Sequence, residues 1–208
     1  MNIEIQKEFA QIPLLAHDLL RNIPIHSLTR LDLPGGRAGM GMLEIKEAGG
    51  FDTGRLPTGP VTTLLFWLRG LIGRVLGWDN DDKLVSAVSY LPRLTPEQRG
   101  RSLISPGQAE GISRVLYCSN NEFLAEIVNR TVHCFWVMGS KEMDGGYRLY
   151  IAVYVRKLNW FTPIYMALVS PLLKWIIYPA LYRSVKEAWA RSFNPGQTQT
   201  VLADRSLV

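Results

Sequence analysis

The sequence is poor in the residues that build disulfide frameworks and metal sites. Its 208 residues include two cysteines, Cys118 and Cys134, and three dispersed histidines. A disulfide scaffold needs several paired cysteines, and a zinc site needs Cys or His clustered at short spacing. Neither pattern is present, so we expect two reduced, buried thiols, no metal and no other cofactor.

Long runs of charge are also missing. Lys and Arg exceed Asp and Glu by 23 to 18, which gives a net charge of +5 and slightly favours anionic partners. The basic residues are scattered, without a run of five or six and without the basic and aromatic interleaving of a nucleic-acid surface. We therefore expect no nucleic-acid partner.

The N-terminus lacks the uninterrupted apolar core of a signal peptide, because Glu4, Lys7 and Glu8 interrupt it. A cytoplasmic protein is the expectation. The length and the 47% apolar content suit one folded domain. We assign residues 1–195 to this single domain and residues 196–208 to a flexible polar tail.

A glycine-rich segment follows the first thirty residues and reads LPGGRAGMGMLEI. A dinucleotide fingerprint or a P-loop would need a different glycine spacing, and a P-loop would also need Gly-Lys followed by Ser or Thr. The segment is therefore predicted to be a turn between surface elements. Further on, apolar residues recur at three- and four-residue steps and predict an amphipathic helix over residues 60–77.

The C-terminal half is rich in Val, Ile, Tyr, Trp and Phe, the residues that suit a pleated sheet. We predict antiparallel strands near 113–118, 122–128, 131–138 and 147–156. The turn before the last strand contains Asp144, Gly145 and Gly146, which supply hairpin geometry.

The most apolar segment is WFTPIYMALVSPLLKWIIYPALY, residues 160–182. Its length suffices to span a bilayer. However, it contains three prolines, and Lys174 near the midplane would cost about 3 kcal/mol. We favour a helix that packs against the sheet and continues in amphipathic form beyond Tyr182. Strands followed by such a helix indicate an α+β fold, with helices on one face of the sheet.

Three stretches carry a resemblance to a known family: WLRGLIGRVLGWD, then LYCSNNEFLAEIVNRTVHCFWV, then YRLYIAVYV with the apolar segment above. They cover about two thirds of the chain, and they resemble the bacterial family called domain of unknown function 2867. The most specific part is the Tyr165-Met166 pair followed by Pro171 and by Tyr178-Pro179. Where family members often have an aromatic residue and arginines after the first of these prolines, this chain has Leu172, Leu173 and Lys174.

The family is itself similar to the helix-grip superfamily of START lipid-transfer domains and polyketide cyclases. That similarity implies a curved antiparallel sheet wrapped around a long C-terminal helix, with an internal hydrophobic cavity. Most such relatives bind apolar ligands, and a minority catalyse cyclisation or dehydration. Related domains also occur fused to short-chain reductase-like domains, which implies a possible partner of that kind.

Three residues are candidates for acid–base chemistry. Glu122 and Glu126 are four apart and share one face of a strand. His133 could donate a hydrogen bond to a ligand or carry a proton. Two solvated carboxylates and a structural histidine are the alternatives, since the sequence offers no paired nucleophile.

Aromatic residues are the candidates for lining a cavity. We single out Trp136, Tyr150 and Tyr154 on the strands with Arg156 beside them, and Trp67 and Tyr165 on the helical side. Ordinary core packing explains these aromatics equally well.

The sequence thus predicts a helix-grip protein that binds a hydrophobic or lipid-like small molecule. A cyclase, isomerase or dehydratase of the polyketide cyclase type is the first alternative. A peripheral membrane protein that presents residues 160–182 to a bilayer is the second and less favoured one.

Overall fold

A computed structural model describes residues 2–51, 87–128, 132–160 and 162–193, except for the side chains of Ile164, Tyr165, Leu168 and Leu172. The predicted helix over residues 60–77 and the predicted tail lie outside this part. The helices are α1 (Ile3–Ala10), α2 (Leu15–Leu19), α3 (Met42–Ala48), α6 (Pro96–Gly100), α7 (Thr162–Leu172) and α8 (Tyr178–Phe193). The strands are β1 (Ile25–Pro34), β2 (Ala109–Glu110), β3 (Ser113–Cys118), β4 (Glu122–Val128), β5 (Val132–Met143) and β6 (Gly146–Lys157).

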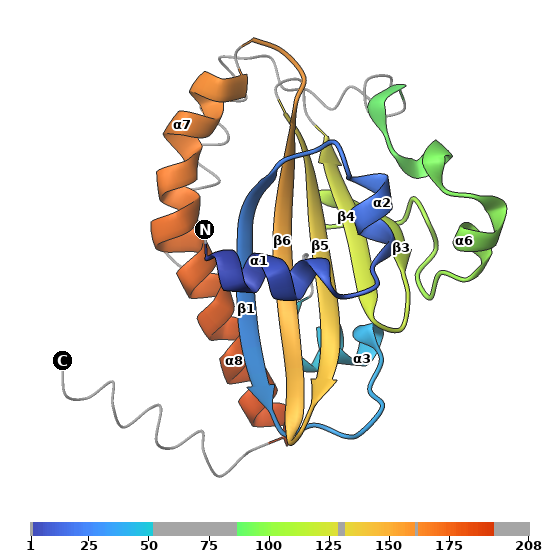
Figure 1. Cartoon of the computed structure of the whole chain (residues 1–208), viewed down its shortest axis with the longest axis vertical. Coiled ribbons are helices and arrows are strands. Elements are labelled where there is room, and N and C mark those ends of the chain that lie inside the picture. The colour runs from blue at the N-terminus through green and yellow to red at the C-terminus, as the bar shows by residue number, and fades with distance from the viewer. Residues whose placement is uncertain (1, 52–86, 129–131, 161, 194–208) are drawn as a thin grey trace.

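All six strands form one curved, open antiparallel sheet in the order β1-β6-β5-β4-β3-β2 (Figure 1). The strands from β3 to β6 follow one another as a meander, as predicted. Strand β1 then adds to the free edge of β6, and its Arg30 pairs with Tyr150. The β5–β6 hairpin turns at Asp144 and Gly145, where Gly145 has the positive φ of 78° that glycine tolerates best. The predicted α+β class is confirmed.

Helices α1 and α2 cover the front face of the sheet in Figure 1. They pack through Phe9, Ala16 and Leu20 against sheet residues that alternate along each strand. Those sheet residues include Leu124, Phe135, Val137, Tyr150, Ala152 and Tyr154.

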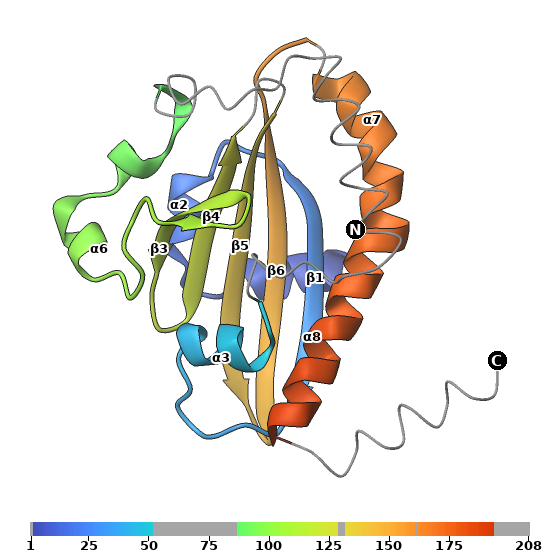
Figure 2. The same ribbon diagram turned by 180° about the vertical axis from the view of Figure 1, so that it is seen from behind.

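Helices α3 and α8 lie against the opposite face (Figure 2). Met42 and Ile45 of α3 and Val185 and Trp189 of α8 pack there. The complementary set of strand residues meets them, including Phe123, Ala125, Met138, Leu149 and Ile151. Helices pack on both faces of the sheet, so the strand residues that point to either face are apolar.

The C-terminal helical segment is interrupted. A π-helical turn over Leu173–Ile177 separates α7 from α8 and follows Pro171, which has no amide hydrogen to donate. We expected residues 160–182 to be buried by the sheet. Instead, among their described side chains only Thr162 and Tyr178 are buried, and the others are half-buried or exposed. Met166 of α7 packs against a small cluster that includes Val153 and Val155 of the sheet, whereas α8 makes the deeper contact through Val185 and Trp189.

The glycine-rich segment is a turn, as predicted. Gly36 has a φ of +93°, and a Cβ added to it would lie 3.0 Å from Trp189 of α8. The indole of Trp189 also donates a 2.8 Å hydrogen bond to the carbonyl of Pro34. The glycines thus allow the end of α8 to approach the backbone closely.

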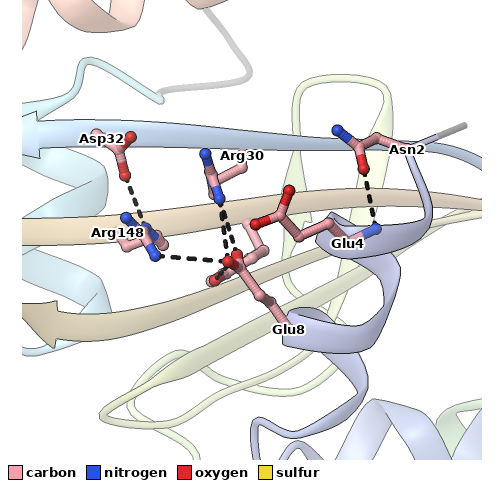
Figure 3. Close-up of polar contacts among 7 residues, drawn as sticks. Asn2, Glu4, Glu8, Arg30, Asp32 and Arg148 are labelled. Carbon is pink, nitrogen blue, oxygen red and sulfur yellow. Dashed lines mark hydrogen bonds and ion pairs between the residues drawn. The ribbon is translucent and has the colours of Figure 1, made fainter.

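Polar contacts fix α1 on the sheet (Figure 3). Arg30 of β1 donates to both carboxylate oxygens of Glu8 at 3.1 Å, and the Tyr150 hydroxyl donates to Glu8 at 2.8 Å. Arg148 lies 3.8 Å from Glu8 and donates a 2.8 Å hydrogen bond to Asp32. The Tyr150 hydroxyl is therefore committed to a structural contact.

Candidate functional site

Two of the three predicted acid–base residues meet in the interior. The Nε2 atom of His133 on β5 lies 2.9 Å from the Oε2 atom of Glu126 on β4. Glu126 pairs with Phe135 and Val128 pairs with His133, so the two side chains are diagonal neighbours on the face covered by α1 and α2. They are 1% and 0% exposed.

The carboxylate of Glu126 accepts two further hydrogen bonds. The hydroxyl of Ser89 donates to Oε1, and the backbone amide of Tyr90 donates to Oε2 at 3.0 Å. Burial acts to raise the pKa of Glu126, but the hydrogen bonds from His133, Ser89 and Tyr90 outweigh it and hold that pKa below its ordinary value. Ser89 donates to Glu126 and not to His133, so this is no Ser-His-acid triad.

The remaining nitrogen of His133 is the unusual feature. Since an ionised carboxylate can only accept, Nε2 is the donor, and a neutral ring then has its lone pair at Nδ1. That atom is buried and has no hydrogen-bond partner among the described residues. The rings of Tyr90 and Phe135 flank the imidazole at centroid distances of 5.4 and 4.2 Å. A carboxylate thus orients a histidine whose basic nitrogen is unused.

Glu122, the third candidate, has a different role at the other end of β4. Its carboxylate accepts hydrogen bonds of 2.8 Å from the backbone amides of Leu15 and Ala16, at the start of α2. Burial raises the pKa of Glu122, against the lowering effect of Tyr117 and of those amides. Glu122 caps a helix that lacks a capping side chain of its own.

A small hollow of about 150 Å³ lies beside this cap. Residues of α2, α6 and the β3–β4 hairpin line it: Leu15, Gln98, Arg101, Ser102, Tyr117, Cys118, Ser119 and Glu122. Burial raises the pKa of the Cys118 thiol to about 11, so the thiol is the neutral form at neutral pH.

The aromatics that we expected to line one cavity are divided between the two faces of the sheet. Tyr150 and Tyr154 pack on the α1 and α2 side, whereas Trp136 packs toward α8. Arg156 is half-buried, and its guanidinium lies 6.0 Å from the ring of Tyr90. The side chain of Tyr165, which lies on α7, and the whole of Trp67 are outside the described part of the chain.

A different set of residues surrounds a hollow between α7 and the sheet, which we call the α7 hollow. Its volume is about 170 Å³. It lies where β1 begins and β6 ends, and its lining consists of Pro24, Ile25, His26, Val155, Lys157, Thr162, Pro163 and Met166. None of these residues is among those predicted to form a site, although Met166 belongs to the motif that carries the family resemblance. The pattern of residues along single strands does not show that α7 lies beside the start of β1, which is more than a hundred residues earlier in the chain.

His26 is the polar group on the β1 side of the α7 hollow. The pairing register of β1 shifts between Ile25 and Ser27, which is the irregularity that re-aims a side chain. Ser170 donates its hydroxyl hydrogen to the carbonyl of Met166, so the Nε2 atom of His26, 3.2 Å from Ser170 Oγ, is the donor in that contact. Burial and the charge of Lys174 lower the pKa of His26, which favours the neutral ring.

Within the described ranges, no group of three or more His, Cys, Asp or Glu side chains is placed to hold a metal ion. Over the same residues, no helix has both the length and the apolar character needed to cross a membrane.

Comparison with known proteins gives one match. Residues 22–180 match the model of the family described as protein of unknown function DUF2867. No curated protein and no solved structure matches the chain. The matched residues include all of β1, the β3–β6 meander and α7.

Proposed function

The chain belongs to the DUF2867 family, and we propose that it binds a small apolar molecule in the α7 hollow. The observation that carries this proposal is the position and lining of that hollow. It lies between the C-terminal helical segment and the sheet, and five of its eight lining residues are Pro, Ile, Val or Met. Ligand sites combine such an apolar wall with a few polar groups.

The volume limits the size of the ligand. Engineered cavities of about 150 Å³ hold benzene, whereas pockets for drug-sized ligands measure about 300–1,000 Å³. The α7 hollow, at about 170 Å³, therefore suits one aromatic ring or a short alkyl segment. A larger ligand would place only its apolar end there.

The polar groups of the lining indicate what the rest of the ligand is. Lys157 at the end of β6 is exposed and positively charged, while His26 favours its neutral form. A ligand with an apolar body and an acidic end would bury the body and leave the acid near Lys157. The driving force is desolvation, at about 25 cal/mol per Å² of apolar surface.

Toluene and benzoate are suitable probes, because they share the ring and differ in the acidic end. We expect both ligands to raise the unfolding temperature, and benzoate to raise it more than toluene because its carboxylate lies near Lys157. In Lys157→Gln this difference between benzoate and toluene should disappear. Native mass spectrometry of the gently purified protein would detect a ligand carried from the cell.

Neighbouring positions on α7 provide a matched pair of variants. Met166 lines the α7 hollow, whereas Ala167 is exposed. Met166→Trp should fill the hollow and abolish the stabilisation by toluene, and Ala167→Trp should leave it unchanged. Equal stabilisation of both variants by toluene would refute binding in this hollow.

A second candidate function rests on the unused Nδ1 atom of His133. A histidine oriented by Glu126 could act as a general base in a cyclisation, isomerisation or dehydration of an apolar substrate. Because both residues are fully buried, the segment around Tyr90 would have to move to admit a substrate.

Loss of a metabolite from a cell extract, followed by mass spectrometry, would test this candidate. His133→Gln and Glu126→Gln should each slow the loss by about a hundredfold or more, the usual contribution of general base catalysis. Glu122→Gln should slow it little, since Glu122 caps α2. Turnover that survives all three substitutions would exclude these acid–base roles.

A further inference from the structure

The outer side of α7 presents apolar side chains to solvent. Pro163, Ala167 and Pro171 are exposed and spaced by four residues, so they follow one face of the helix. Trp175 continues this line in the π-helical turn and is 80% exposed. We call these four residues, together with Lys174, the Trp175 face. Trp160, just before α7, is 79% exposed.

An exposed tryptophan of this kind is costly in water, and continuous apolar patches on monomers mark interaction sites. In both views α7 lies along the side of the molecule, beyond β1, with its outer surface clear of the other labelled elements (Figures 1 and 2). Among the residues that the structure describes, no labelled element stands between the Trp175 face and a large flat partner.

The sequence that carries this face is basic between Asp144 and Glu187. Residues 145–186 contain six Lys and Arg and no Asp or Glu. Four of the six have exposed side chains close to α7 in sequence, namely Lys157, Lys174, Arg183 and Lys186. Exposed basic side chains thus accompany the apolar residues of the Trp175 face along the sequence.

We propose that the Trp175 face docks on the surface of an anionic lipid bilayer, with α7 lying in the interface. Tryptophan is enriched at the level of the lipid headgroups, and amphipathic interfacial helices combine apolar residues with Lys and Arg. Exposed basic residues add attraction to anionic headgroups. The helix lies on the bilayer and does not cross it, in keeping with the charge of Lys174 in the π-helical turn that follows.

The docking and ligand binding in the α7 hollow can be separated at two neighbouring positions, although Pro163 belongs to both surfaces and Lys157 also lines the hollow. Met166, which lines the hollow, is half-buried on another side of α7, whereas Ala167 belongs to the docking face. Met166→Trp should therefore leave membrane binding unchanged, and Ala167→Trp should strengthen it. Failure of one proposal is thereby distinguishable from failure of the other.

Vesicle flotation with the full chain tests the proposal. The protein should float with vesicles of phosphatidylcholine mixed with phosphatidylglycerol and remain in the dense fraction with phosphatidylcholine alone. Trp175→Ala should weaken binding by about tenfold, and raised salt should weaken it further by screening. Leu103→Ala removes another exposed apolar side chain, far from α7 in sequence, and should change binding by less than about twofold.

Charge variants of equal net charge complete the test. Lys174→Gln with Arg183→Gln should weaken flotation by about tenfold, whereas Arg101→Gln with Lys141→Gln should leave it nearly unchanged. Brominated lipids should quench the tryptophan fluorescence of the bound wild type, because Trp175 would contact the bilayer. In Trp175→Ala the fraction of fluorescence that is quenched should be smaller.

Three results would overturn the proposal. They are an absence of flotation with anionic vesicles, equal losses in the target and control variants, and flotation that is independent of Trp175. Concentration-dependent dimerisation that Trp175→Ala abolishes, without flotation of the wild type, would assign the face to a second copy of the chain. Thermal unfolding of each variant verifies that it is folded.

Discussion

The Nε2 atom of His133 lies 2.9 Å from the Oε2 atom of Glu126, and this contact joins β4 to β5 in the interior of the protein. Glu126 also binds the Ser89 hydroxyl and the Tyr90 amide, so one carboxylate ties residues 89 and 90 to the sheet. Its removal would leave the buried ring of His133, the buried amide of Tyr90 and the half-buried hydroxyl of Ser89 without this acceptor. The pair therefore matters for stability whether or not it has a catalytic role.

Glu126→Ala should lower the free energy of unfolding by about 3 kcal/mol, because several donors would lose their acceptor at about 1–3 kcal/mol each. Glu126→Gln should cost less, because the amide oxygen still accepts one hydrogen bond. Urea denaturation measures both.

Glu97→Ala is the control for this prediction. Glu97 forms an exposed ion pair with Arg101 on α6, so its loss should not measurably shift the urea midpoint. If Glu126→Ala were as stable as Glu97→Ala, the buried carboxylate would not anchor the segment around Tyr90.

The strand pattern could be predicted from the sequence because the meander is rich in β-branched and aromatic residues and its last hairpin has a clear turn. The predicted strands 113–118 and 122–128 coincide with β3 and β4. The face that lines a cavity could not be predicted. Both faces are covered by helices, so Trp136 on one side and Tyr150 on the other are equally apolar signals. Strand β1 was missed as a distinct element because its partner β6 is more than a hundred residues away.

The hairpin between β5 and β6 supplies a second prediction. A Cβ added to Gly146 would lie 2.3 Å from the backbone oxygen of Leu33, which cannot move as a side chain can. Gly146→Ala should therefore lower the free energy of unfolding by about 3 kcal/mol, the upper end of the cost of overpacking.

Gly145 and Gly100 are matched controls for Gly146. Gly145 has a positive φ but no atom within 4 Å of an added Cβ, so Gly145→Ala should cost only about 1 kcal/mol of backbone strain. Gly100 on α6 has neither constraint, and Gly100→Ala should stabilise by up to about 1 kcal/mol. Thermal unfolding that ranked the three variants differently would contradict this account.

A third prediction concerns the cap of α2. Glu122→Ala would leave the buried amides of Leu15 and Ala16 without an acceptor and should cost about 2 kcal/mol. Amide hydrogen exchange should increase at these two residues before it increases in β5 or β6. Glu47→Ala, an exposed position on α3, should leave the exchange unchanged.

The proximity of Glu126 to His133 was open to prediction, since both were candidates and their strands were correctly placed. The role of Glu122 was not, because the helix that it caps lies 106 residues earlier in the chain. The apolar character of residues 160–182 led to the expectation of burial, but α8 packs more deeply on the sheet, and α7 contacts it through fewer side chains, such as Met166. The composition of a segment shows how apolar it is, but it does not show which other elements pack against it.

The pH dependence of stability tests the environment of His26. Burial and the nearby Lys174 lower the pKa of His26 in the folded protein, while the unfolded chain has a histidine pKa of about 6.5. Above that pH the ring is neutral in both states, so its contribution to stability is fully present. As the pH falls below about 6.5, the unfolded chain takes up the proton first, and the free energy of unfolding decreases until the folded pKa is passed.

His26→Gln should remove this component, so urea unfolding between pH 7.5 and about pH 5 should decline less steeply in the variant than in the wild type. Lys174→Gln should reduce the difference only partly, because burial is the larger cause of the lowered pKa. The same protonation would place a charge in the lining of the α7 hollow and should weaken the stabilisation by toluene at low pH. Parallel pH profiles of wild type and His26→Gln would show that the ring is solvated in the folded protein.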